Sequence, residues 1–246
     1  MHRIAIVFLV LLTARAAAQD APVSTTVVPV VGSAYGVSMA RWLTDVEIIN
    51  DTGGQVDVAI ELVAVPDAPV FFTTLSPGQV QRFTDIVGQA FGMESALSPL
   101  RVTTGGRRSV SVRAQAYAIR GGEVSTPQRL DAYGRETWFP IRVLDNLGFS
   151  DELRTNIGLV NLGDQDAEFL LALQRVPGRS VAITHLRIGA GSLLHISIQS
   201  LFPMITDGNG FSVVVETPSR QTHVYASVIR NADNSAQFIA SRVGSR

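Results

Sequence analysis

The sequence repeats itself at a distance of 111 residues, and this repeat constrains the fold more than any other feature of the chain. Residues 43–50 (LTDVEIIN) match 154–161 (RTNIGLVN), and the match continues into the next apolar stretch. A period of about 110 residues is the length of a domain rather than of a solenoid repeat. We therefore expect two homologous domains, 22–133 and 134–246, with a linker between Gly121 and Gly134. Looser matches keep the same order: 75–78 with 188–191, 85–91 with 197–202, 100–102 with 211–213 and 118–120 with 228–230.

The hydrophobic pattern predicts strands. Residues 55–62 alternate polar and apolar side chains, which directs Val56, Val58, Ile60 and Leu62 to one face. Short segments rich in Gly, Pro, Asp and Asn separate such stretches, and only 85–91 and 197–202 favour one or two helical turns. The expected fold is all-β: two tandem Ig-like antiparallel β-sandwich domains of about seven strands each, related by internal duplication.

The first 18 residues have the pattern of a secretory signal peptide. A short basic start precedes an unbroken apolar run over residues 4–12, and small residues follow at a site for cleavage after Ala18. Nine helical residues span only about half of a bilayer core, which disfavours a transmembrane helix. The protein is therefore expected to be secreted or periplasmic, without a transmembrane segment after cleavage.

The composition excludes several classes of protein. The 20 basic residues, all of them arginine, are balanced by 21 acidic residues, whereas nucleic-acid binding needs a basic excess. The chain contains no cysteine, which removes disulfide scaffolds, thiolate zinc sites, cysteine catalysis and a lipoprotein anchor. A hydrophobic content of 46% is too high for a disordered chain.

A resemblance adds to this pattern. The segments at 42–50 and 154–161, together with Leu75-Ser76-Pro77-Gly78, 85–92 and 225–228, resemble repeats of uncharacterised secreted bacterial proteins with duplicated Ig-like β-sandwiches. The resemblance covers most of the chain after the signal peptide. It implies Ig-like sandwiches attached to or secreted alongside surface and degradative systems, and it assigns no catalytic residue. The chain departs from the pattern at Pro203-Met204, where the second domain lacks the Phe-Gly ending of the first.

Polar residues that recur in both repeats are the first candidate site. The pairs Thr44/Asp45 and Thr155/Asn156 can contact a ligand or ion at a sandwich edge, or they can bond neighbouring backbone and fix the strand register. Asn50 and Asn161 end their strands, where asparagine favours turns. Because both domains need the fold but need not share a site, the structural interpretation is favoured.

Histidines are the second candidate. If residues 181–198 form a hairpin turning at Gly189-Ala190-Gly191, His185 and His195 lie opposite each other on adjacent strands. Such a pair can bind zinc or copper, but no carboxylate lies nearby in the sequence, and His223 has to join through the fold. We therefore name no metal site.

Known catalytic motifs are missing from the sequence. Neither G-x-S-x-G nor H-E-x-x-H occurs, and the dispersed carboxylates define no glycosidase pair. The segment Gly105-Gly106-Arg107-Arg108 fits a hairpin tip better than an anion site, and Trp42 and Trp138 suit core or interface packing. No catalytic, cofactor-binding or metal-binding residue is assigned.

Three functions compete on this evidence. The favoured one is an exported, non-catalytic binding or structural module that contacts a protein or surface partner through its loops and sheet faces. The alternative is a secreted hydrolase with a site between the two domains, which needs converging acid, base or metal ligands. A periplasmic chaperone of the donor-strand kind is disfavoured, because the stretch 109–119 offers small alanines where bulky alternating residues are needed.

Overall fold

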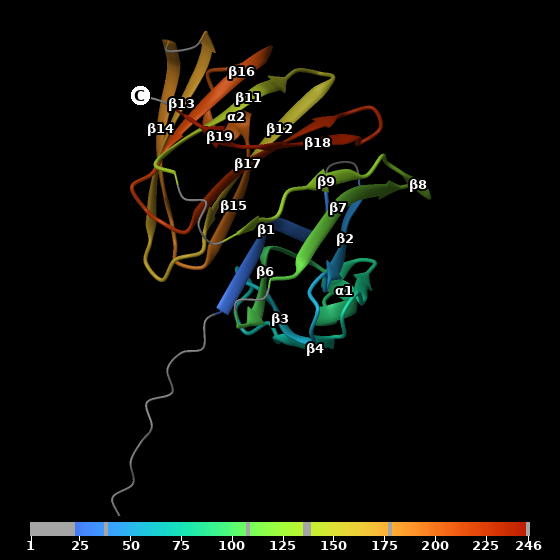
Figure 1. Ribbon diagram of the computed structural model, residues 1–246. Helices are drawn as coiled ribbons and strands as arrows, with labels where there is room; N and C mark the ends of the chain where they lie inside the picture. The colour runs from blue at the N-terminus through green and yellow to red at the C-terminus, as the bar shows by residue number, and fades with distance from the viewer. Residues whose placement is uncertain (1–22, 37–38, 107–108, 135–138, 177–178, 245–246) are drawn as a thin grey trace, which may run out of the picture.

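The computed structural model describes residues 23–36, 39–106, 109–134, 139–176 and 179–244. These residues fold mainly into antiparallel strands, which confirms the predicted all-β class. Figure 1 shows two halves packed against each other, the first coloured blue to green and the second yellow to red. The predicted signal peptide and its cleavage site lie outside the described residues.

The first half contains the elements β1 to β10 and one short helix. In chain order they are β1 (Val23–Tyr35), β2 (Arg41–Ile49), β3 (Val56–Leu62), β4 (Phe71–Leu75), β5 (Val80–Phe83), α1 (Ile86–Phe91), β6 (Ala96–Gly105), β7 (Ser111–Arg120), β8 (Glu123–Val124), β9 (Gln128–Leu130) and β10 (Tyr133–Gly134).

The second half contains the elements β11 to β19 and a second short helix. In chain order they are β11 (Ile141–Phe149), β12 (Leu153–Asn161), β13 (Ala167–Val176), β14 (Arg179–Ile188), β15 (Ser192–Ser197), α2 (Ile198–Leu201), β16 (Gly208–Glu216), β17 (Thr222–Arg230), β18 (Ala236–Ala240) and β19 (Arg242–Val243).

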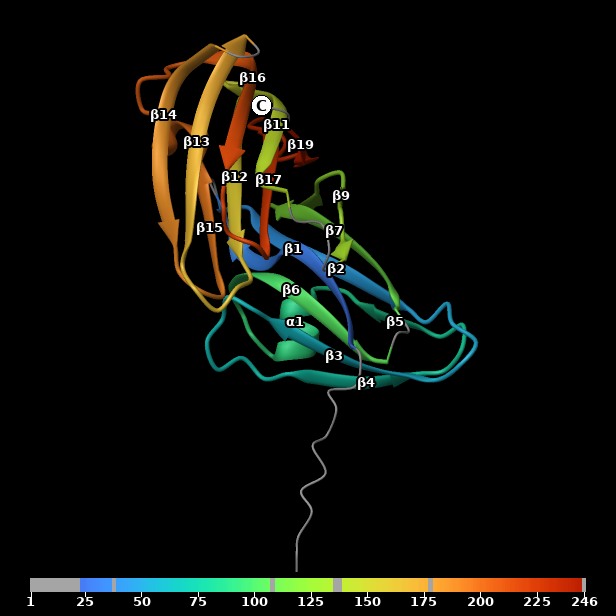
Figure 2. The same cartoon turned by 60° about the vertical axis from the view of Figure 1, so that its left-hand side comes forward.

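The two halves have the same strand order. One layer of the first half runs β4-β3-β6-β1, with β10 on β1, and its counterpart runs β14-β13-β16-β11-β19. The other layer runs β5-β2-β7-β9, and its counterpart runs β15-β12-β17-β18. The long strand β1 pairs with β6 along most of its length and with β2 at its end, so it joins both layers of the first half. Figure 2 shows β14 and β13 of one layer of the second half in front of β15 and β12 of the other.

Each half has its own apolar core between its two layers. Alternation in β3 buries Val56, Val58, Ile60 and Leu62 in the first core, as the pattern predicts. The equivalent strand β13 buries Phe169, Leu171 and Leu173 in the second core. Strand β1 contains Pro29, and its register with β6 shifts between Val28 and Val31, at the point where proline has no N–H for the ladder.

Both predicted helical turns are present at equivalent places. The carboxylate of Asp85 caps α1 by accepting from the Gly88 N–H at 3.3 Å, and the hydroxyl of Ser197 caps α2 by accepting from the Ser200 N–H at 3.0 Å. Among the described residues, neither helix has the length and apolar character needed to span a membrane.

Two local predictions are wrong. The stretch 181–198 does not form a hairpin, because β14 pairs with β13 in one layer while β15 pairs with β12 in the other. The stretch from Gly121 to Gly134 is not a linker, because β8 and β9 pair with β7 and β10 pairs with β1. The expected domain boundary between 133 and 134 therefore falls inside β10.

The repeated threonines connect two strands in each half through side-chain hydrogen bonds to backbone. Thr44 in β2 accepts from the Gly32 N–H at 2.9 Å and donates to the Gly32 carbonyl at 3.2 Å. Thr155 in β12 makes the same two bonds with Gly148 in β11, at 3.3 and 2.5 Å. Both threonines are buried, and their bonds hold the two strands in register, as the structural interpretation expects.

The repeated asparagines also have matching partners. The Nδ2 group of Asn50 donates to the Gly54 and Leu75 carbonyls, at 2.8 and 2.9 Å. That of Asn161 donates to the Gln165, Ile188 and Gly189 carbonyls, at 2.7, 3.1 and 3.0 Å. Both side chains are buried, and each joins the turn after its own strand to the end of another strand, β4 in the first half and β14 in the second.

Replacing Asn161 by alanine should lower the free energy of unfolding by about 2–4 kcal/mol, because buried carbonyls lose their donor. Asn50→Ala should have an effect of similar size, since its bonds match. Urea denaturation measures both values. Asn209→Ala, at an exposed position of β16, is the control and should change stability by less than about 0.5 kcal/mol. Unchanged stability in Asn161→Ala would contradict the structural role.

Candidate functional site

The outer face of the layer β15-β12-β17-β18 is covered by the first half. In β17, Val224 and Ala226 point into the second core, whereas His223, Tyr225 and Ser227 alternate with them and are buried as well. Phe238 of β18 packs against the core of the first half. A face that is normally exposed to water has therefore become the contact between the two halves.

The first half shows what this face looks like when it is exposed. Glu47 in β2 lies between Arg82 of β5 and Arg113 of β7. The guanidinium of Arg82 pairs with the Glu47 carboxylate at 2.7 Å, and 72% of the Arg82 side chain is exposed. The 111-residue repeat places Gly158 at the position of Glu47.

In the second half, the same row contains an aromatic and an imidazole ring instead of charges. Gly158 lies between His195 of β15 and Tyr225 of β17. A Cβ atom on Gly158 would lie 2.0 Å from the Tyr225 ring, so only glycine leaves room for this ring over the strand. The row of charged, solvated side chains in the first half thus corresponds in the second half to a row that packs against another surface.

Tyr225 is the centre of a stack of rings. Its ring lies between His195 and Phe238, with centroid distances of 5.8 and 5.4 Å. The Tyr225 hydroxyl and His195 Nδ1 are 2.9 Å apart and form a hydrogen bond. Burial lowers the pKa of His195 to about 4 and raises the pKa of Tyr225. Both groups are therefore neutral near pH 7, and the tautomer of the imidazole decides which of them donates in this hydrogen bond.

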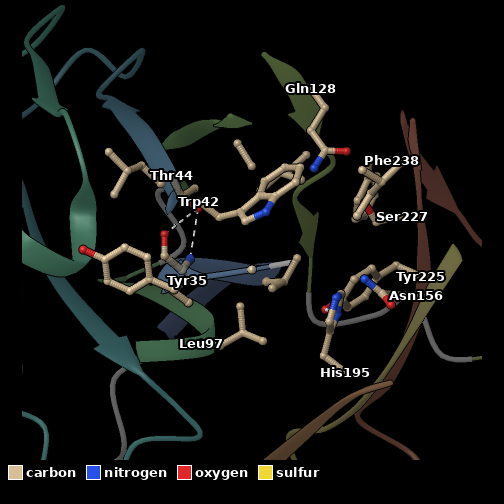
Figure 3. A pocket seen from close by; sticks show the side chains of 18 of the residues that line it. Tyr35, Trp42, Thr44, Leu97, Gln128, Asn156, His195, Tyr225, Ser227 and Phe238 are labelled. Atoms are coloured by element: carbon tan, nitrogen blue, oxygen red, sulfur yellow. Dashed lines mark hydrogen bonds between the residues drawn. The ribbon is translucent and has the colours of Figure 1, made fainter. Parts of the chain in front are cut away.

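A cavity of about 230 Å³ lies beside this stack, between the two halves; we call it the junction cavity. Figure 3 shows Tyr35, Trp42 and Leu97 of the first half on one side, with His195, Tyr225 and Phe238 of the second half opposite. The wall is mainly apolar, and its polar side chains include Thr44, Gln128, Arg154, Asn156, His195 and Ser227.

The junction cavity has no acidic group in its described wall. Arg154 is the charged residue among the described lining side chains, and it donates to the Asn231 and Asn234 side-chain oxygens at 2.7 and 2.8 Å. Burial lowers its pKa, but an arginine keeps its charge at neutral pH. His195 therefore has no carboxylate here to orient it as a general base.

One polar atom in the wall lacks a partner. The Gln128 side chain is 9% exposed, and its Oε1 is buried without a hydrogen bond to any described residue. Figure 3 shows its amide group between Trp42 and Phe238. Buried amide oxygens in folded proteins are nearly always paired, so this acceptor is an exception within the described residues.

A second buried polar group lies between the halves, at His223. Its ring packs on Tyr133 of β10 with centroids 5.2 Å apart. Burial, with a smaller contribution from Arg142, lowers the pKa of His223 to about 4, and burial raises that of Tyr133 to about 12. The Arg142 guanidinium donates to the Thr222 carbonyl at 2.8 Å.

The structure separates the three histidines. His185 is exposed on β14 and pairs with Leu170, whereas His195 and His223 lie on the covered face of the other layer. Within the described residues, no three His, Asp or Glu side chains gather as metal ligands. Of the two tryptophans, Trp42 lines the junction cavity; Trp138, like Arg107 and Arg108, lies outside the described part of the chain.

The remaining repeated pair diverges between the halves. The Asp45 carboxylate accepts from the Tyr117 hydroxyl and the Asp85 N–H, both at 3.1 Å. Its counterpart Asn156 lines the junction cavity instead. Sequence reasoning considered a site between the two domains but did not assign these residues to it, although the exchange of Glu47 for Gly158 within the repeat was a visible sign that the two faces differ.

Comparison with known proteins assigns no relationship. No protein-family model matches the sequence, and no curated protein matches it significantly.

Proposed function

We propose that this protein is an exported, non-catalytic binding module that holds another molecule rather than transforming it. The observation that carries the proposal is the junction cavity, which both halves line mainly with apolar and neutral polar groups. A wall of this kind binds by burying apolar surface and fixing a few hydrogen bonds.

The proposal includes a tandem duplication of one Ig-like sandwich. Its support is the equal strand order of the halves, the equivalent bonds of Thr44 and Thr155, and those of Asn50 and Asn161. After duplication, one copy can keep a solvated outer face while the other adapts the same face to the contact. Export is supported by the sequence pattern of residues 1–18.

The alternative function, a hydrolase between the halves, lacks its chemistry at the junction cavity. Hydrolysis there needs a base with a pKa near the working pH and a group that orients it. His195 instead shares a hydrogen bond with the Tyr225 hydroxyl, and burial keeps its pKa near 4. At neutral pH this imidazole is uncharged, and the described wall of the cavity offers it no carboxylate partner.

A turnover assay tests the proposal. The purified protein, offered chromogenic esters, glycosides and peptides at pH 5 to 8, should release no more product than a heat-denatured sample. His195→Ala should leave this background unchanged, as should His185→Ala at the exposed control position. Saturable hydrolysis that disappears in His195→Ala but persists in His185→Ala would establish the hydrolase instead.

A further inference from the structure

We infer that the contact between the two halves is acid-sensitive: the halves part without unfolding, and protonation of His195 and His223 drives them apart. The observations behind this inference are the way the halves meet, the polar atoms buried between them and the surroundings of the two histidines. Because both halves line the junction cavity, parting also opens that cavity, and this consequence rests on the proposed binding function.

Among the described residues, no β-ladder joins the two halves. Strands β1 to β10 pair with one another, and the strands of the second half pair within two further sheets. The halves meet through side chains where β9 approaches β18, β6 approaches β15 and β1 approaches β17. Each half also has its own apolar core. Parting the halves therefore costs side-chain contacts but no backbone ladder, which makes it less costly than unfolding.

Three polar atoms buried at this contact have no described hydrogen-bond partner: Gln128 Oε1, the Tyr133 hydroxyl and His223 Nδ1. Gln128 lines the junction cavity, and the Tyr133 and His223 rings have centroids 5.2 Å apart. A buried polar group without a partner destabilises the state that buries it. Water satisfies all three atoms when the halves part, and this hydration opposes the apolar burial of Tyr225 and Phe238 that holds the halves together.

His223 faces no acidic partner on the elements packed against it. Tyr133 of β10 covers its ring, and β12 contributes the apolar Val160 directly opposite. Burial and, to a smaller extent, Arg142 of β11 lower the pKa of His223, while burial and, to a smaller extent, the exposed Asp131 raise that of Tyr133. A proton on His223 therefore places a cation near the Arg142 guanidinium in a buried contact.

His195 has a similar environment in the wall of the junction cavity. Its ring meets the Tyr225 hydroxyl of β17 at 2.9 Å, and β6 contributes the apolar Leu97 to the same wall. The charged group of this wall is Arg154 of β12, and the described lining includes no carboxylate. A protonated His195 therefore also lacks a counter-charge while the halves stay together, and it gains water when they part.

Acid shifts the equilibrium toward the parted state. In the closed protein both histidines have a pKa of about 4, chiefly because of burial, whereas a hydrated histidine titrates near 6.5. The parted state therefore binds more protons below pH 6.5, and the ratio of parted to closed protein rises as the pH falls toward 4. Between pH 7 and pH 4.5 this ratio should rise about 60-fold per histidine and about 3,000-fold for both.

Thiol labelling measures the parting directly, because the chain contains no cysteine of its own. Val160→Cys places a thiol opposite His223 on the covered face, and Ala226→Cys places one in the second core. Both native side chains are 0% exposed, so 4,4′-dithiodipyridine reacts only with protein that opens. At pH 7, Val160→Cys should react at least about tenfold faster than its own unfolding constant, from urea denaturation, allows. Ala226→Cys should react no faster than its unfolding allows.

Labelling at lower pH tests the role of the histidines. Gln115→Cys, at an exposed position of β7, gives the reactivity of the reagent at each pH. Relative to it, labelling of Val160→Cys should rise about 3,000-fold from pH 7 to pH 4.5. Adding His195→Gln and His223→Gln should reduce this rise to less than about tenfold. Adding His185→Gln, at an exposed position of β14, should leave the rise unchanged.

Two results overturn the inference. Labelling of Val160→Cys at the rate of its global unfolding shows that the halves do not part as units. An acid-induced rise that survives both glutamine substitutions shows that other groups drive the parting. The labelling involves no ligand and no turnover, so either result leaves the proposed binding function standing, whereas hydrolysis in the turnover assay refutes that function without affecting this inference.

Discussion

Replacement of Gly158 by alanine should lower the free energy of unfolding by about 3 kcal/mol, at the upper end of the usual cost of overpacking. The added methyl group would lie 2.0 Å from two ring atoms of Tyr225. That ring is buried and stacked between His195 and Phe238, so moving it costs these contacts. Displacing it also breaks the hydrogen bond to His195 Nδ1 and disturbs the wall of the junction cavity.

Matched variants isolate this clash. Gly105→Ala changes another strand glycine, where an added Cβ meets no atom within 4 Å, and it should leave stability almost unchanged. In a Tyr225→Ala background, Gly158→Ala should cost little more, because the obstructing ring is gone. Equal and additive effects of Gly158→Ala in both backgrounds, measured by urea denaturation, would show that the ring is not the cause.

The fold class and much of the local structure could be predicted from the sequence, because they depend on local pattern. Alternation placed Val58 and Ile60 in the core, and the local sequence predicted helical turns over 85–91 and 197–202, where α1 and α2 lie. The structural role of Asn161 also followed from its position at a strand end, where asparagine satisfies turn backbone. These features need no knowledge of how distant surfaces meet.

The misplaced hairpin shows where local pattern fails. A short glycine-rich turn after β14 can return the chain within one layer or carry it across to the other. The sequence at 189–191 is compatible with both paths, and packing decides between them. Because β15 pairs with β12, His195 lies in a different layer from His185, the partner expected for it. Its ring contacts Tyr225 instead.

The prediction of a linker over residues 121–134 was wrong for a related reason. Its glycines, Pro127 and charges indicate an exposed connection, but strands β9 and β10 complete the two layers of the first half. Gln128 and Leu130 are buried there. The unpaired amide of the junction cavity therefore comes from a segment that composition alone assigns to a linker.

Acidification should destabilise the protein between pH 6.5 and pH 4 because two buried histidines resist protonation. Burial is the main cause that lowers the pKa of His195 and of His223 to about 4 in the folded protein, whereas an unfolded histidine titrates near 6.5. The unfolded chain therefore binds more protons in this window. The stability that is fully present above pH 6.5 is lost as the pH falls toward 4, by about 2 kcal/mol per histidine at pH 4.5.

Two substitutions distinguish these histidines from the carboxylates that titrate at lower pH. We expect the double variant His195→Gln/His223→Gln to lose about 4 kcal/mol less stability than the wild type between pH 7 and pH 4.5, as measured by urea denaturation at each pH. His185→Gln, at an exposed position of β14, should follow the wild-type curve. A pH dependence that is the same in the wild type and the double variant would assign the acid sensitivity to carboxylates. It would also mean that water reaches His195 and His223, and the face between the two halves would then be open rather than closed.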